Sequence, residues 1–141
     1  MSGERYSCEL PATARSVTEA RRFVLDALAN WDLDAVADTA ALLTSEVVTN
    51  AILHARTPLG LVVRREKKGI AVEVTDGSRR QPRVRDTAPE STNGRGLALL
   101  EQLASSWDVQ LHRTGKTVRF TVTGDSDPWA AFTTGEWAVD V

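Results

Sequence analysis

The sequence predicts an α+β fold, a two-layer sandwich in which helices cover one face of a mixed, mainly antiparallel sheet. Three observations lead to this prediction. Apolar residues recur at helical spacing in the first half of the chain, and two pairs of short alternating segments are joined by short glycine-containing linkers. Strand and helix segments are also grouped, whereas a doubly wound parallel sheet would alternate them one by one.

The predicted order of elements is strand, helix, helix, hairpin, long loop, helix, hairpin. The expected ranges are 6–10 for the first strand, 16–30 and 34–56 for the first helices, 60–65 and 70–75 for the first hairpin, 97–104 for the third helix, and 107–112 and 117–123 for the second hairpin. Ser16 and Glu19 have the spacing of a capping box, which would begin the first helix.

One domain is expected over residues 1–123, followed by a tail over 124–141. The tail contains aromatic residues, which would pack on the domain or at a dimer seam or would stay partly disordered. Residues 78–93 show no hydrophobic periodicity, and loops of this length in compact domains are typically lids, binding loops or disordered segments.

Composition indicates a soluble, cytoplasmic protein. Of the 141 residues, 42% are hydrophobic and 26% are charged, which is typical of a globular domain. The formal net charge of −2 gives no overall attraction to nucleic acid or to an anionic membrane. Cys8 is the only cysteine, so an internal disulfide and a thiolate metal cluster are excluded. No apolar run suggests a membrane span, and no signal peptide is recognisable.

A line of polar residues along the second helix is the strongest functional signal. Glu46, Asn50 and His54 lie at roughly 0°, 40° and 80° around the helix axis, next to Leu42 and Leu53. An unpaired carboxylate within an apolar arc is costly, so we expect these side chains to meet a ligand or an ion. The alternatives are a surface pair for Glu46 and Asn50, and a structural role at the helix end for His54.

Two further segments have chemistry suited to a nucleotide. Asp76-Gly77 follows a buried strand, where a carboxylate can accept a hydrogen bond from an amino group such as that of adenine. Gly94-Arg95-Gly96 precedes a helix, whose N-terminus attracts phosphate. Taken alone, the first segment is a turn signal and the second is a helix entry without a ligand.

Together these segments resemble the motifs of the GHKL ATPases, which share the Bergerat fold. Residues 45–55 (SEVVTNAILHA) look like the N box, 74–77 (VTDG) like the first glycine box, and 94–100 (GRGLALL) like the second. Within this superfamily the chain is most similar to small ATP-binding proteins of the anti-sigma-factor serine/threonine kinase type. The resemblance covers about residues 5–123.

This resemblance implies ATP and Mg²⁺ as cofactors. Asn50 would hold the metal, Glu46 would orient or deprotonate the attacking hydroxyl group, and Asp76 would read the adenine amino group. The other residues expected to line the nucleotide site are His54, Gly77, Gly94, Arg95, Gly96, Leu97 and Thr117.

The sequence departs from the family pattern at two places. Arg79 stands where the first glycine box usually has its second glycine. Lys116 stands where many members have a threonine beside the adenine-reading aspartate, so Thr117 is expected to substitute for it. Both departures fall near the adenine end of the site.

The resulting functional hypothesis is an ATP-binding regulator that phosphorylates an antagonist protein on Ser or Thr and sequesters a sigma factor. The alternative is a non-catalytic partner-binding module in which the nucleotide is structural or absent. A stray histidine-kinase catalytic domain is disfavoured, because no dimerisation helices with a phosphoacceptor histidine precede the polar line. The expected partners are a sigma factor and an antagonist protein, without nucleic acid or membrane, and a homodimer is compatible with an exposed edge strand.

Overall fold

The computed structural model describes residues 4–79 and 92–124, with residues 92–97 described in their backbone only. The elements are β1 (Arg5–Leu10), α1 (Arg15–Asn30), a 3-10 turn (Asp34–Val36), α2 (Ala37–His54), β2 (Leu59–Arg65), β3 (Gly69–Asp76), α3 (Thr92–Leu103), β4 (Ser106–Leu111) and β5 (Lys116–Thr123). Predictions about residues 80–91 and about the tail over 125–141 lie outside the described residues.

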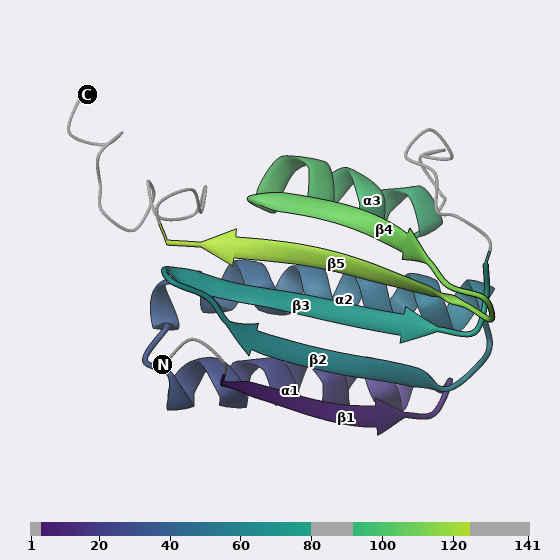
Figure 1. The fold of residues 1–141 in the computed structure, drawn as a ribbon, viewed down its shortest axis with the longest axis horizontal. Coiled ribbons are helices and arrows are strands. Elements are labelled where there is room, and N and C mark those ends of the chain that lie inside the picture. The colour runs from purple at the N-terminus through teal and green to yellow at the C-terminus, as the bar shows by residue number, and fades with distance from the viewer. Residues whose placement is uncertain (1–3, 80–91, 125–141) are drawn as a thin grey trace.

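The described strands form one five-stranded sheet in the order β1-β2-β3-β5-β4, and every neighbouring pair is antiparallel. The helices lie together behind one face of this sheet, as Figure 1 shows. The predicted α+β sandwich is therefore confirmed. The two hairpins are adjacent because β3 pairs with β5, which brings together the ends of segments that are far apart in the sequence.

Alternation along the central strands separates a core face from an open face. Val72 and Val74 on β3 and Val118 and Phe120 on β5 are buried in the core with the helices. The residues between them point to the opposite face, which can be polar because an antiparallel sheet commonly has one face in contact with solvent. On this face Glu73 forms ion pairs with Arg64 at 3.2 Å and with Arg119 at 3.7 Å.

Helix α2 lies in the middle of the helical layer. It packs against α1 and α3 and buries Leu43, Val47 and Val48. By length and composition alone, Asp34–His54 is long and apolar enough to cross a membrane, whereas no apolar run in the sequence suggested a membrane span. Half of that window is nevertheless buried inside the protein, as in the core helix of a globular domain.

The predicted capping box is wrong. Helix α1 begins at Arg15, so Ser16 lies inside the helix and not before it. The Ser16 hydroxyl is buried and donates a hydrogen bond to the main-chain oxygen of Pro11 at 2.6 Å. Glu19 instead forms an exposed ion pair with Arg15, with a nitrogen–oxygen distance of 3.7 Å. The local spacing was right, but the turn after Pro11 provides the partner for Ser16.

Helix α3 also begins earlier than predicted, at Thr92 instead of Leu97. Gly94 and Gly96 therefore lie within its first turns, although glycine is an unfavourable residue inside a helix. Predicted strand ends differ from the observed ones by one residue at most positions, which is the usual uncertainty of a boundary.

Candidate functional site

The polar line on α2 follows the border of its buried face. Glu46 and Asn50 are half-buried and His54 is exposed, whereas Val47 and its neighbours on the adjoining face are buried. The sequence predicted that this line of residues lies within an apolar arc of the helix. That prediction is wrong, because Leu53, which borders the line, is 47% exposed.

Glu46 and Asn50 nevertheless remain on one side of α2, one turn apart. The side-chain oxygen Oδ1 of Asn50 is buried, although the residue as a whole is only half-buried. His54 occupies the last turn of the helix, where the dipole favours a cation. Its exposure agrees better with this structural role than with lining a closed pocket.

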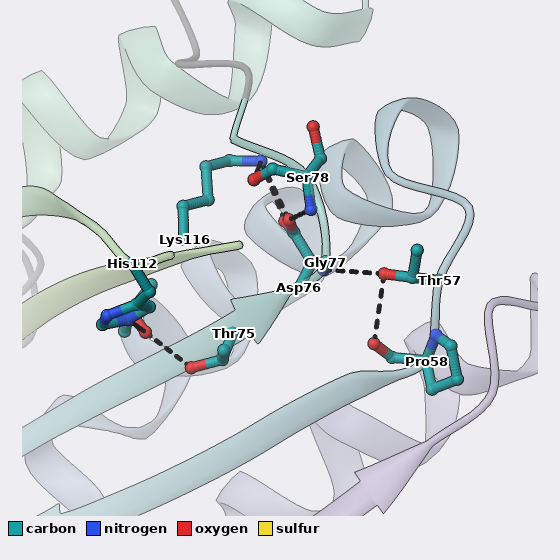
Figure 2. Close-up of polar contacts among 9 residues, drawn as sticks. Thr57, Pro58, Thr75, Asp76, Gly77, Ser78, His112 and Lys116 are labelled. Atoms are coloured by element: carbon teal, nitrogen blue, oxygen red, sulfur yellow. Dashed lines mark hydrogen bonds and ion pairs between the residues drawn. The ribbon is translucent and has the colours of Figure 1, made fainter. Parts of the chain in front are cut away.

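Asp76 ends β3 and has a buried side chain. Its Oδ1 accepts a hydrogen bond from the main-chain N–H of Ser78 at 2.8 Å, which turns the chain directly after the strand. The next residue is held as well, because the N–H of Gly77 donates to Oγ1 of Thr57 at 2.8 Å. Figure 2 shows these contacts, which fasten the end of β3 to the segment that follows α2.

Lys116 is the partner of Asp76, and this interaction was not predicted from the sequence. Its Nζ donates to both carboxylate oxygens of Asp76, at 3.1 Å to Oδ1 and 2.9 Å to Oδ2 (Figure 2). A longer contact of 3.5 Å reaches the main-chain oxygen of Ser78. Only 6% of the Lys116 side chain and 2% of the Asp76 side chain are exposed. Such burial is tolerated because each charge has an opposite charge as its partner.

Thr117 does not lie beside Asp76. In the β3–β5 register Asp76 is opposite Lys116 and Thr75 is opposite Thr117, so the two pairs point to opposite faces of the sheet. The Thr117 hydroxyl is 2.6 Å from Oγ1 of Thr75 and 2.7 Å from Nε2 of His112. The substitution of Thr117 for the threonine of the family pattern is therefore geometrically wrong, because a shift of one residue along a strand reverses the direction of the side chain.

The second glycine segment is described in its backbone only. Gly94, Arg95, Gly96 and Leu97 lie in the first half of α3, and their side chains are outside the described residues. Helix α3 packs against α2, the helix that carries Glu46 and Asn50. The backbone thus brings the helices of the N-box and second-glycine segments together.

Within the side chains described, no group of three or more His, Cys, Asp and Glu residues is placed to hold a metal ion. A Mg²⁺ ion bound mainly by phosphate oxygens and water does not need such a group, because it commonly takes only one or two protein ligands. An oxygen ligand such as Asn50 suits this mode of binding. Asp76 fits the nucleotide base less well, because the carboxylate oxygens that would accept a hydrogen bond from the adenine amino group already bind Lys116.

Comparison with known proteins agrees with this architecture. Residues 10–122 match the family model of the histidine kinase-like ATPase domain, and the chain belongs to this family. This membership confirms the resemblance to the GHKL ATPases and implies ATP binding. A search of curated protein sequences finds no significant match.

Among solved structures, the chain is similar to the RsbU and RsbW domains of Rv1364c from Mycobacterium tuberculosis. The TM-score is 0.62 at 19% sequence identity, and the match covers 85% of this chain. It covers only 32% of the other chain, so the present chain spans about a third of that protein. At this level of identity the likeness concerns the fold.

Proposed function

We propose that the protein is an ATP-binding regulator of the anti-sigma-factor type, which phosphorylates an antagonist protein on Ser or Thr and sequesters a sigma factor in the cytoplasm. The observation that supports this proposal most directly is the position of Glu46 and Asn50, one turn apart on the helix that packs against α3. Membership of the histidine kinase-like ATPase family supports ATP as the ligand. The likeness to a chain with an RsbW domain supports the assignment to regulators of the anti-sigma-factor type.

Each residue has a distinct role in this proposal. Asn50 offers its amide oxygen to Mg²⁺, and Glu46 accepts the proton of the attacking hydroxyl group. ATP, when bound, would supply its terminal phosphoryl group to this hydroxyl group, and ADP would be the leaving group. The backbone N–H groups at the start of α3 favour phosphate because they belong to the positive end of the helix dipole.

The test is a phosphorylation assay with γ-labelled ATP and candidate antagonist proteins from the same genome. The wild type should label an antagonist, and Glu46→Gln should lower the rate by about 10²-fold or more while nucleotide binding is kept. Glu9→Gln is the matched control, because it makes the same change at an exposed position on β1. If Glu46→Gln transfers phosphate as fast as the control, Glu46 has no part in the reaction.

One observation favours a second candidate, a partner-binding module in which the nucleotide is structural or absent. The carboxylate of Asp76 is bound to Lys116 and therefore lacks the open acceptor that adenine recognition needs. A thermal-shift assay with Mg-ATP separates the first candidate from a module without nucleotide, because a ligand that binds only the native state raises the melting temperature. The phosphorylation assay separates it from a module in which the nucleotide is structural. Sigma-factor binding of equal strength with and without Mg-ATP, together with no thermal shift, would favour the module.

A further inference from the structure

We infer that Lys116 controls the nucleotide affinity of this site by occupying the carboxylate of Asp76, so that adenine contributes little to binding in the wild-type protein. This inference rests on the proposed function only in taking ATP as the ligand. It assigns a specificity-determining role to Lys116, which the resemblance to the family does not supply.

The carboxylate of Asp76 has little capacity left for a base. Oδ1 accepts from the N–H of Ser78 at 2.8 Å and from Lys116 Nζ at 3.1 Å, and Oδ2 accepts from the same ammonium group at 2.9 Å. Because Nζ is nearly equidistant from the two oxygens, it covers the outer edge of the carboxylate. Of the two oxygens only Oδ2 has a lone pair left, so an adenine amino group would have to share this oxygen with the ammonium group.

Burial keeps the ammonium group in this position. With 6% of the Lys116 side chain exposed and 2% of the Asp76 side chain exposed, neither group is accessible to a base without movement. Displacing Lys116 from Asp76 would leave a buried cation without its counter-ion, which is strongly unfavourable. This cost reduces the free energy that adenine could contribute by binding to Asp76.

The backbone supports the same geometry. Lys116 and Asp76 are directly opposite each other in the β3–β5 register, so the pair is a direct consequence of strand pairing. Thr75 precedes Asp76 on β3, and Thr117 follows Lys116 on β5. These two threonines are paired with each other on the other face of the sheet, so neither can replace Asp76 as an acceptor for adenine. Adenine recognition through Asp76 thus requires Lys116 to move.

The first experiment uses the wild-type protein and asks what the base contributes. Isothermal titration calorimetry compares Mg-ATP with Mg-tripolyphosphate, which has phosphates but no base. We expect the two dissociation constants to agree within about threefold, because a base that makes no hydrogen bond to Asp76 adds little. A preference of the wild type for Mg-ATP of about tenfold or more would overturn the inference and leave ATP binding intact.

The second experiment replaces the lysine. Lys116→Met keeps an unbranched side chain but removes the ammonium group. This change should raise the affinity for Mg-ATP by about tenfold or more and leave the affinity for tripolyphosphate unchanged. Lys67→Met is the matched control, because it removes an exposed lysine from the β2–β3 connection. Equal Mg-ATP affinities of Lys116→Met and Lys67→Met would overturn the inference.

The outcomes also separate this inference from the proposed function. If neither ligand binds the wild type or Lys116→Met, the nucleotide site itself is absent, and both the proposed function and the inference fail. If Lys116→Met does not fold, as circular dichroism would show, the comparison of the two ligands on the wild type still decides the question.

Discussion

Gly115 packs directly against the main-chain carbonyl group of Asp76, and a β-carbon at this position would overlap the carbonyl oxygen. The contact holds the turn before β5 against the end of β3, where the Asp76–Lys116 ion pair forms. The absence of a side chain at Gly115 is therefore part of what builds this end of the sheet.

Gly115→Ala should lower the free energy of unfolding by about 1–3 kcal/mol, because backbone atoms must shift to admit the methyl group. Urea denaturation measures this change. Gly60→Ala is the control, because the nearest atom to a β-carbon there is Cβ of Thr75 at 3.8 Å, an ordinary contact distance. A Gly115→Ala protein as stable as the Gly60→Ala protein would show that the overlap is relieved without cost.

The buried ion pair should be visible in stability as well as in binding. Lys116→Met and Asp76→Asn each leave one buried group without its partner, so each should cost about 3–5 kcal/mol. The double variant should cost clearly less than the sum of the two single variants, because no unpaired charge remains. Chemical denaturation of the four proteins gives this coupling.

Arg15 and Glu19 provide the exposed reference pair, since 86% and 47% of their side chains are exposed. The same cycle on these residues should give a coupling near zero, because exposed pairs are worth little. Additive effects at Asp76 and Lys116 would mean that the two charges do not stabilise each other.

Asn50→Ala should weaken the Mg²⁺-dependent binding of tripolyphosphate by about tenfold or more, because it removes the oxygen that we assign to the metal. Calorimetry with and without Mg²⁺ measures the effect. Thr117→Val is the control, because Thr117 lies on the opposite face of the sheet from Asp76 and Lys116. Weaker binding by Thr117→Val, with no loss in Asn50→Ala, would place the metal site elsewhere.

Burial raises the pKa of the Cys8 thiol above its ordinary value of 9.0, and the carboxylate of Glu19 adds to the effect. The thiolate is the reactive form, so alkylation by iodoacetamide should begin at higher pH in the folded protein than in urea. Because the native state holds the proton more tightly, this contribution to stability is present below the unfolded pKa and is lost as pH rises through the folded pKa. Identical pH profiles in the two states would contradict the shift.

The elements that could be predicted from the sequence are those whose signal is local. Hydrophobic periodicity predicted a helix over 34–56, which the structure has at Ala37–His54, and the strands of both hairpins. An amphipathic pattern shows directly which side of an element is buried. The line of Glu46 and Asn50 was predicted for the same reason, since residues four apart share one side of a helix.

The failures concern contacts between segments. The capping box at Ser16 and Glu19 had the correct spacing, but the Ser16 hydroxyl binds Pro11 in a turn that spacing does not reveal. Thr117 was placed beside Asp76 because it follows Lys116, yet neighbouring residues of a strand point to opposite faces.

By itself, the sequence determined the fold class, the order of elements and the helix side that carries Glu46 and Asn50, because each of these follows from short-range periodicity. Only the tertiary structure decided which charge meets Asp76. The pairing of β3 with β5 joins residues 40 positions apart, and the register of that pairing, not the local sequence, places the ammonium group of Lys116 on the carboxylate.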